Sequence, residues 1–295
     1  MGHIMDKKHY AVLGYPLEHT LSPVLHQKLF ALTGVEAEYT AISIKPEEFA
    51  ERAEALFELD GFNITMPYKQ RIIPYLDGMT EEAMRFGAVN TVWVDKNAAA
   101  DGLALLSGGK RLKRLGHNTD ITGVIKSFEM LNVSFKGNLC IAGAGATAGM
   151  IAAEAVRRGG SVTIAVRASS LQKGEALVHA LKKLSAEPRV RAVALDTLNE
   201  PFDLLINATP CGMYPNINEC VFSDAAIQNA GAIFDLIYNP SSTVLCEKGA
   251  LFGKRVLNGL PMLVWQAAAA HEFWYHAVFQ QKDVLSVVDG LKFIL

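Results

Sequence analysis

Short apolar runs separated by helical patterns recur along the chain. In the first half, apolar runs predict strands at His9–Gly14, Glu38–Ile44, Gly61–Ile64 and Val89–Val94. Helices are predicted between them: one opened by Ser22 as N-cap and Pro23 and ending before Gly34, one at Pro46–Phe57, and one beginning at Pro67. This half therefore predicts an α/β domain.

The pattern becomes regular after Asn138. Five apolar runs predict strands at Leu139–Ala142, Ser161–Val166, Ala192–Leu195, Asp203–Asn207 and Ala232–Leu236. Helical segments lie between most of them, at Thr147–Arg158, Leu171–Leu184 and Asp224–Gln228. Further helices are predicted at Thr119–Leu131, Gly259–Ala277 and Val284–Leu295. Alternation of strand and helix predicts a parallel sheet wrapped by helices.

Length, composition and charge narrow the class of protein. The chain has 295 residues, which suits two domains, and half of them are hydrophobic. A formal net charge of −2 gives no electrostatic basis for binding nucleic acid or an anionic membrane. No apolar run reaches the ~18–20 residues that span a bilayer, and the first residues lack the apolar core of a signal peptide. We therefore expect a cytoplasmic protein.

The cysteines argue against a metal site and against disulfides. Cys140, Cys211, Cys220 and Cys246 form no Cys-x-x-Cys pair, and none lies beside a histidine at metal-ligand spacing. Reduced thiols and no bound metal are expected.

A glycine-rich loop follows the predicted strand at Leu139–Ala142 and opens an alanine-rich helix. It reads Gly143-Ala-Gly145-Ala146-Thr147-Ala148, the form of a dinucleotide-binding turn. Gly143 permits the tight turn, Gly145 lets the backbone approach a pyrophosphate, and Ala148 allows close helix–sheet packing. The helix N-terminus would supply N–H donors to the phosphates. The alternative is a glycine-rich turn in an α/β domain without a dinucleotide.

The end of the next strand indicates which dinucleotide is bound. Sites for NAD usually carry an acidic residue there, whereas Ser161–Val166 is followed by Arg167, Ser169 and Lys173. Two cations and a hydroxyl suit a 2′-phosphate, so we predict NADP. The use of NAD stays open, because an arginine at a helix start can also point to water.

Two polar motifs supply candidates for proton transfer. Lys69 ends the motif Asn63-Ile-Thr-Met-Pro-Tyr-Lys69, and Asp120 ends Asn118-Thr-Asp120. A lysine held by a carboxylate can take a proton from an alcohol, which oxidation by hydride transfer requires. Taken alone, Lys69 is better explained as a surface helix residue and Asp120 as a helix N-cap.

Five more motifs occur in order with these two. They are Gly14-Tyr-Pro-Leu-Glu-His-Thr20-Leu-Ser22-Pro-Val-Leu-His26, Ala88-Val-Asn90-Thr91, Asn207-Ala-Thr209-Pro-Cys-Gly212-Met213, Asp235-Leu-Ile-Tyr238-Asn-Pro240 and Asn258-Gly259-Leu-Pro-Met262-Leu-Val-Trp-Gln266-Ala. Together the seven resemble the shikimate dehydrogenase family, including its quinate/shikimate branch, over nearly the whole chain. The resemblance implies NADP-dependent interconversion of shikimate and 3-dehydroshikimate in the biosynthesis of aromatic amino acids.

The resemblance also implies a role for each matched residue. Lys69 and Asp120 would be the catalytic pair. Substrate contacts would come from Thr20, Ser22, Thr65, Asn90, Tyr238 and Gln266. Cofactor contacts would come from Gly143, Gly145, Ala146, Thr147, Ala148, Arg167, Ser169, Lys173, Thr209 and Gly259. His19 and His26 would be hydrogen-bonded scaffold and not proton carriers.

The fold class that follows is α/β with two domains. Residues 1–117 plus 259–295 would form the substrate and catalytic domain, and residues 118–258 a Rossmann-type NADP-binding domain. The site would lie in the cleft between them. The partner would be a small cyclic hydroxy acid such as shikimate or quinate, with neither nucleic acid nor membrane, and a homodimer stays open.

The chain also departs from the family pattern. Ile121 follows Asp120 where the family usually has Gly, so we expect the helix to start there with a negative φ. Thr20 replaces a common Ser, Val166 replaces a common Asn, and the loop Leu105–Arg114, with its basic cluster, is longer than usual. Two alternatives remain open, a quinate/shikimate dehydrogenase that uses NAD and a catalytically silent ligand sensor of the same fold.

Overall fold

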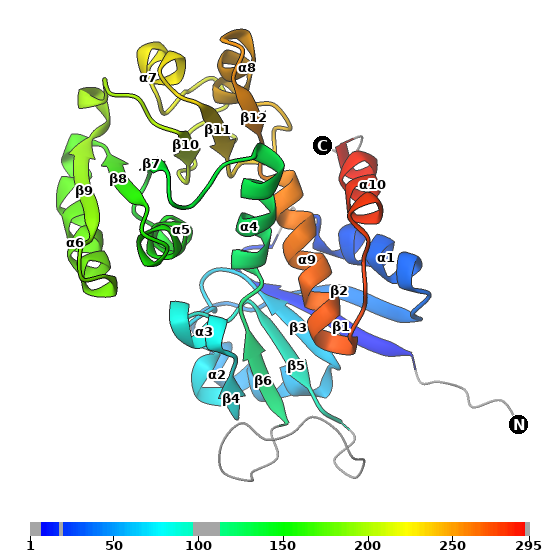
Figure 1. Ribbon diagram of the computed structural model, residues 1–295. Coiled ribbons are helices and arrows are strands. Elements are labelled where there is room, and N and C mark those ends of the chain that lie inside the picture. The colour runs from blue at the N-terminus through cyan, green and yellow to red at the C-terminus, as the bar shows by residue number, and fades with distance from the viewer. Residues whose placement is uncertain (1–6, 18–19, 97–112, 293–295) are drawn as a thin grey trace, which may run out of the picture. The chain divides into compact units, whose positions relative to one another are not determined.

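The chain divides into two units in the computed structural model, which describes residues 7–17, 20–96 and 113–292. One unit comprises Met1–Asp120 and Val264–Leu291, and the other Ile121–Leu263 and Lys292–Leu295. The sequence predicts the boundaries after residues 117 and 258. Each unit contains one six-stranded sheet (Figure 1).

The sheet of the first unit is mixed. Its strands are β1 (Lys8–Gly14), β2 (Ala37–Ser43), β3 (Gly61–Ile64), β4 (Gly78–Met79), β5 (Thr91–Val94) and β6 (Arg114–His117). Their order is β2-β1-β3-β5-β6-β4; β1 is parallel to β2 and β3, and β5 is antiparallel to β3 and β6. The carboxyl ends of β3 and β6 therefore lie beside the start of β5. The motifs around Lys69, Asn90 and Asp120 follow or precede these strand ends, so the topology brings them together.

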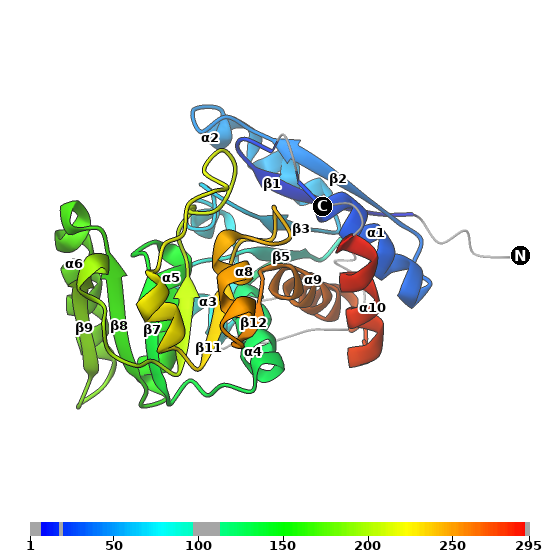
Figure 2. The ribbon, with the colours of Figure 1, turned by 90° about the horizontal axis from the view of Figure 1, so that it is seen from above.

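Apolar side chains pack on both faces of this sheet because alternate residues of a strand point to opposite sides. Ala11 and Leu13 of β1 belong to a core with Phe49, whereas Tyr10 of the same strand belongs to another with Trp274. The helices of this unit are α1 (Ser22–Thr33), α2 (Phe49–Arg52), α3 (Glu81–Phe86), α9 (Leu260–Tyr275) and α10 (Gln281–Lys292), with short 3₁₀ turns at Glu54–Glu58 and Ile73–Tyr75. Helices α1 and α10 lie side by side in both views (Figures 1 and 2).

The second unit has an all-parallel sheet of order β12-β11-β10-β7-β8-β9. Its strands are β7 (Asn138–Ala142), β8 (Ser161–Val166), β9 (Arg189–Ala194), β10 (Leu204–Asn207), β11 (Ala232–Asp235) and β12 (Arg255–Leu257). Its helices are α4 (Asp120–Leu131), α5 (Ala146–Arg157), α6 (Leu171–Leu181), α7 (Asp224–Gln228) and α8 (Val244–Leu251). Numbered from β7, this is the Rossmann order 3-2-1-4-5-6, and the direction of winding reverses between β7 and β10.

Two predicted helix starts are wrong. Leu21 and not Ser22 is the N-cap of α1, since the backbone N–H of Leu25 donates to the Leu21 carbonyl at 2.9 Å. No helix begins at Pro67; the chain makes turns there and then the short 3₁₀ turn at Ile73–Tyr75. Burial of Tyr68 explains this difference, because its anchored ring holds the segment in a turn.

Part of the predicted basic loop lies outside the described residues. Of the segment 105–114, only Lys113 and Arg114 are described. Arg114 is bidentate to Glu54, at 2.7 and 3.1 Å, and its guanidinium lies 3.9 Å from the centroid of the Phe57 ring. This arginine is therefore a packed structural residue. Within the described ranges, no helix is both long and apolar enough to span a membrane.

Candidate active site

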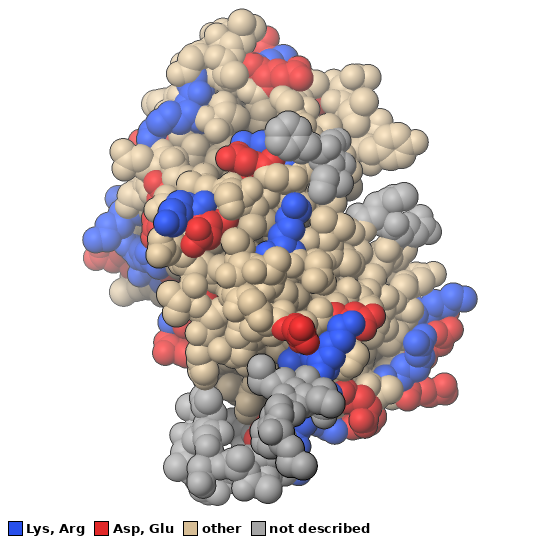
Figure 3. All heavy atoms as spheres, turned by 90° about the vertical axis from the view of Figure 1, so that its right-hand side faces the viewer, with Lys and Arg blue, Asp and Glu red and all other residues tan. Residues whose placement is uncertain are grey.

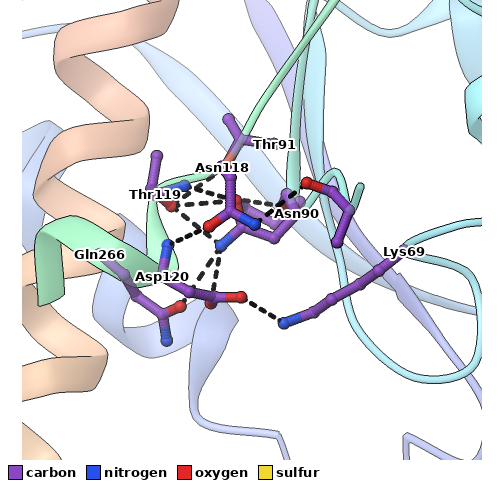
Figure 4. A network of polar contacts seen from close by, with 9 residues as sticks. Lys69, Asn90, Thr91, Asn118, Thr119, Asp120 and Gln266 are labelled. Carbon is purple, nitrogen blue, oxygen red and sulfur yellow. Dashed lines mark hydrogen bonds and ion pairs between the residues drawn. The ribbon is translucent and has the colours of Figure 1, made fainter. Parts of the chain in front are cut away.

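Lys69 and Asp120 form an ion pair where β3 and β6 end. The Nζ atom of Lys69 lies 2.6 Å from Oδ2 of Asp120 (Figure 4). The side chains are 26% and 13% exposed. The pair is thus partly shielded from water but still open to a small ligand.

The turn that carries Lys69 is fixed by the residue before it. Tyr68 is buried, stacks on Phe49 with ring centroids 4.7 Å apart, and donates its hydroxyl to the Ile44 carbonyl. The Lys69 carbonyl accepts the backbone N–H of Val89 at 2.8 Å. The backbone of Lys69 is therefore held on two sides, and only its side chain extends toward the site.

Asp120 begins α4, and buried polar residues hold the segment before it. The Asn118 carboxamide accepts the backbone N–H of Asp120 at 3.1 Å and donates to the Ala88 carbonyl at 3.0 Å. The backbone N–H of Thr119 donates to Oδ1 of Asn90 at 2.8 Å. The carboxylate stands at a helix N-terminus, where the helix dipole favours negative charge.

Asn90 is the hub of the network in Figure 4. Its Nδ2 donates to Oδ1 of Asp120 at 2.8 Å and to the Thr119 hydroxyl at 3.0 Å, and lies 3.5 Å from Oε1 of Gln266 on α9. Its Oδ1 accepts the Thr119 N–H and the Thr91 hydroxyl, the latter at 3.0 Å. Since a backbone N–H can only donate and a carboxylate only accept, the orientation of this amide is fixed from both ends. Asn90, Asp120, Lys69 and Gln266, predicted from separate motifs, are thus brought together.

Three other predicted residues lie on the same unit. The Ser22 backbone N–H donates to Oγ1 of Thr20 at 3.2 Å, and the Thr20 hydroxyl donates to Oγ of Ser22 at 3.1 Å. This direction leaves the hydroxyl proton of Ser22 available to an anion at the start of α1. Thr65 follows β3, and a Cβ on Gly14 would stand only 2.4 Å from the Thr65 methyl group. Gly14 therefore makes room for Thr65.

A cavity of about 650 Å³ opens at the carboxyl ends of β7, β8 and β10. Gly143, Ala144 and Gly145 line one side of it. Gly143 has φ +108°, and a Cβ there would meet the Ala208 carbonyl at 2.9 Å, so the turn requires glycine. A Cβ on Gly145 would meet no atom within 4 Å, and this N-cap of α5 has no side-chain cap. Gly145 places the N-terminus of α5 at the cavity; Ala146 and Thr147 open the helix and Ala148 is buried, and these three residues do not line the cavity wall.

Cations line the same cavity beyond β8. Arg167, Ser170 and Lys173 contribute to its wall, and Thr209 contributes from the end of β10. The lining serine is Ser170; Ser169, the predicted one, lies in the same short turn and is exposed. This donor set fits a dinucleotide that carries a 2′-phosphate.

Gly259 and Tyr238 lie at the end of the same sheet. The Gly259 N–H donates to the Ile237 carbonyl at 2.9 Å, and a Cβ on Gly259 would stand 2.1 Å from the Leu236 carbonyl oxygen. The glycine is thus required where two backbone segments meet. Burial raises the pKa of Tyr238, so its hydroxyl stays protonated and can donate.

Comparisons with known proteins agree with this geometry. A family model described as the shikimate dehydrogenase substrate binding domain matches residues 12–92. A shikimate dehydrogenase (NADP(+)) from Halothermothrix orenii is 34% identical over 275 residues, which is 89% of both chains. The chain belongs to the shikimate dehydrogenase family. The resemblance predicted from the seven motifs is therefore confirmed.

Solved structures of the family share the fold. A shikimate dehydrogenase crystallised with NADP⁺ superposes with a TM-score of 0.83 at 30% identity, covering 96% of this chain and 95% of that one. A shikimate 5-dehydrogenase from Listeria monocytogenes in complex with shikimate and NAD gives a TM-score of 0.81 at 26% identity, with 99% of each chain covered. The predicted α/β class with a Rossmann-type domain is confirmed.

Ile121, a departure from the family pattern, does not disturb Asp120. It is the second residue of α4 and 4% exposed, and it is not among the described non-glycine residues with positive φ. Its side chain packs inward while the carboxylate of Asp120 bonds Lys69. The expectation of a helical start with negative φ is confirmed.

Several residues of the network were not singled out from the sequence. Thr91 and Thr119 are both fully buried and bond Asn90, and Asn63 donates to Thr91. Each belongs to a recognised motif, but only the fold shows which atoms meet. Within the described residues, no group of three or more His, Cys, Asp and Glu could hold a metal ion.

His26 and His271 form a buried pair on the same unit, with Nδ1 of His26 2.8 Å from Nε2 of His271. Burial lowers the pKa of His26 well below 6.5, assisted by His271, and lowers the pKa of His271 to about 3. Both rings are therefore neutral in the folded protein. His26 is scaffold in this structure, as the sequence predicts.

This pair predicts a loss of stability in mild acid. The unfolded chain binds protons at both histidines below pH ~6.5 whereas the folded chain does not, so the stabilisation is complete above that pH and falls as the pH drops toward the folded values. From about pH 7.5 to about pH 5.5 each ring should remove ~1.4 kcal/mol from the free energy of unfolding, or ~3 kcal/mol together. Urea titrations at the two pH values measure this. Equal free energies would contradict it, and the exposed control variant His9→Gln should keep the full difference.

Proposed function

We propose that this chain is an NADP-dependent shikimate dehydrogenase that interconverts shikimate and 3-dehydroshikimate in aromatic amino acid biosynthesis. The observation that carries the proposal is the Lys69–Asp120 pair, hydrogen-bonded through Asn90 to Gln266, in a chain of this family. A ligand sensor would not need a lysine and a carboxylate 2.6 Å apart beside an open site. Residue types and geometry together favour chemistry over sensing.

The chain's own residues account for the proton. When the ring alcohol is oxidised, its C–H bond is lost with both electrons as hydride and its O–H bond is lost as a proton. NADP, when bound, supplies the hydride acceptor. Lys69 in its neutral amine form would take the proton from the hydroxyl oxygen, and Asp120 would hold the ammonium that forms. The opposite assignment, with Lys69 polarising the hydroxyl and Asp120 as proton partner, uses the same pair.

Substrate recognition would use the hydroxyls and amides of the same unit. Ser22 would donate to the substrate carboxylate near the start of α1, where the helix dipole attracts an anion, and Thr20, which donates its own proton to Ser22, would hold that hydroxyl in place. Thr65, Asn90 and Gln266 would bond ring hydroxyls, and the resemblance to the family also implies a ring contact for Tyr238. The Listeria monocytogenes relative, crystallised with shikimate, supports this substrate class.

The cofactor would occupy the cavity at the ends of β7, β8 and β10. Gly143 and Gly145 would admit the pyrophosphate to the first turn of α5, and Arg167, Ser170 and Lys173 would hold the 2′-phosphate. A relative crystallised with NADP⁺ and a 34% identical one named for NADP(+) support this choice. NAD is the second candidate, since the Listeria relative was crystallised with it.

We infer the location and the kinds of partner from the free cysteines and from the distribution of charged side chains on the surface. All four cysteines are free, which suits a reducing compartment, and we place the enzyme in the cytoplasm. On the face shown in Figure 3, basic and acidic side chains are interspersed and form no basic stripe, so we expect neither nucleic acid nor membrane as partner. A homodimer would be compatible with an end strand such as β2 of the first sheet or β9 of the second, where a strand of a second chain could pair.

Turnover of shikimate tests the proposal. The purified chain, mixed with shikimate and NADP, should form NADPH over many cycles. Calorimetric binding of shikimate without any NADPH formation would favour the ligand sensor. Preferred turnover of quinate with NAD would favour the quinate/shikimate dehydrogenase.

A further inference from the structure

A series of partly buried hydrogen bonds continues behind the proposed catalytic pair. The carboxamide Nδ2 of Asn63 donates to the Thr91 hydroxyl at 3.0 Å and to the Asn90 carbonyl at 3.3 Å. The hydroxyl of Tyr39, on the edge strand β2, donates to Oδ1 of Asn63 at 2.7 Å. The series thus runs from Tyr39 through Asn63 and Thr91 to Asn90, the hub that bonds Asp120.

The direction of these bonds leaves Tyr39 as the required donor. A backbone carbonyl only accepts, so Nδ2 of Asn63 must face the Asn90 carbonyl and Oδ1 must face Tyr39. Tyr39 is 6% exposed, and burial raises its pKa well above 10, so the hydroxyl keeps the proton that it donates. Without that proton, the partly buried Oδ1 of Asn63 would lose this donor and the amide would be less firmly held.

The ring of Tyr39 also contacts the helix that carries Ser22. It stacks on His26 of α1 with centroids 3.9 Å apart and an interplanar angle of 8°. His26 follows Ser22 by one helical turn, so it is rigidly connected to that residue.

The tautomer of His26 follows from its neighbours. The Thr33 hydroxyl donates to the Leu29 and Phe30 carbonyls, so it accepts from the Tyr275 hydroxyl at 3.2 Å. Tyr275 must then accept from Nδ1–H of His271, and Nε2 of His271 must accept from Nδ1–H of His26. The His26 ring is therefore held in one orientation against Tyr39.

We propose that Tyr39 is a positioning residue that contacts two parts of the substrate site, the network around the Lys69–Asp120 pair and the helix α1 that carries Ser22. Its hydroxyl fixes Asn90 and hence Asp120 and Lys69, and its ring fixes α1 and hence Ser22. The inference rests on the proposed function, because it assigns Tyr39 to the site that would oxidise shikimate. Tyr39 touches no reacting atom and carries no proton to the site, since the amides between it and Asp120 do not relay protons.

The test is Tyr39→Phe, which removes the hydroxyl and keeps the stacked ring. We expect kcat for shikimate oxidation to fall roughly tenfold, because small misplacements of catalytic groups are costly, and the KM for shikimate to stay within about twofold because His26 and α1 remain in place. The control is Tyr10→Phe: Tyr10 is the register partner of Tyr39 on β1, is 4% exposed, and belongs to the same apolar core. This variant should keep both constants.

A second variant separates positioning from general loss of structure. Thr91→Val removes the hydroxyl that joins Asn63 to Asn90, with almost no change in volume, and should give the same fall in kcat. The double variant should be no slower than the slower single one, because both remove the same series of bonds. If Tyr39→Phe does not fold, Thr91→Val decides by the same split between kcat and KM.

Three outcomes overturn the inference: a kcat of Tyr39→Phe equal to that of Tyr10→Phe, a double variant whose losses multiply, or a kcat of Thr91→Val equal to that of the parent. Each of these kcat values is compared with that of the parent chain, which must itself oxidise shikimate. A parent chain without that activity would instead refute the proposed function.

Discussion

Replacing Lys69 by Ala is expected to lower kcat for shikimate oxidation by roughly two to four orders of magnitude, the usual contribution of a general acid or base. The variant loses the group that lies 2.6 Å from Asp120 and would accept the hydroxyl proton. The substrate carboxylate and the other ring hydroxyls keep their contacts, so the KM for shikimate should change by less than about threefold. Steady-state kinetics with NADP in excess measure both constants.

A matched lysine variant controls for the loss of positive charge. Lys45 is exposed and lies on the same unit, and Lys45→Ala should match the parent chain. Asp120→Asn should also lower kcat, because the amide cannot hold an ammonium as a carboxylate does. Near-normal turnover by Lys69→Ala would remove Lys69 from the mechanism and leave Asp120 as the only candidate of the pair.

Replacing Arg167 by Ala is expected to raise the KM for NADP by roughly 10- to 150-fold, the equivalent of about 1.5–3 kcal/mol for a hydrogen bond to a charged group. Arg167 lines the cavity beside Ser170 and Lys173, which are the other groups placed to hold a 2′-phosphate. NAD lacks that phosphate, so its KM should change by less than about twofold. The KM values for both cofactors, measured at saturating shikimate, give the comparison.

The control for Arg167 is Lys183→Ala, an exposed cation on the same unit outside the cavity wall. It should leave both cofactor constants unchanged. A KM that rises equally for NADP and NAD in Arg167→Ala would show that the arginine does not recognise the 2′-phosphate. Selectivity would then have to come from Lys173 or Ser170.

The second unit was largely predictable because its structure is local and repetitive. The strand Ser161–Val166 and the helix Asp224–Gln228 were predicted with the observed bounds. Each is a short apolar or amphipathic run that follows a Gly or Ser, Gly160 and Ser223 respectively, and the turn at Gly143 has a positive φ that favours glycine. Where neighbouring residues determine the backbone conformation, sequence patterns are sufficient to predict the element.

The first unit was less predictable because distant residues decide its turns. A helix was predicted to begin at Pro67, but Tyr68 is buried against Phe49, a residue on another element. Ser22 has the chemistry of an N-cap, yet the backbone starts the helix one residue earlier. No window of sequence contains those contacts.

In the proposed site, too, some features could be predicted from sequence motifs and others depend on contacts between distant residues. Lys69 and Asp120 were named from motifs, whereas the orientation of Asn90 and the role proposed for Tyr39 depend on hydrogen bonds across four strands. Tyr39 in a strand pattern is simply a β-favouring aromatic residue. Only the pairing of β2, β1 and β3 brings its hydroxyl to Asn63.

Hydride transfer between shikimate and NADP is tested by the specificity constant, kcat/KM, measured for shikimate and quinate with NADP and NAD. We expect shikimate with NADP to give the highest of the four values, and lower values when either the substrate or the cofactor is exchanged. A highest value for quinate with NAD, or no reduced cofactor in any of the four mixtures, would contradict it.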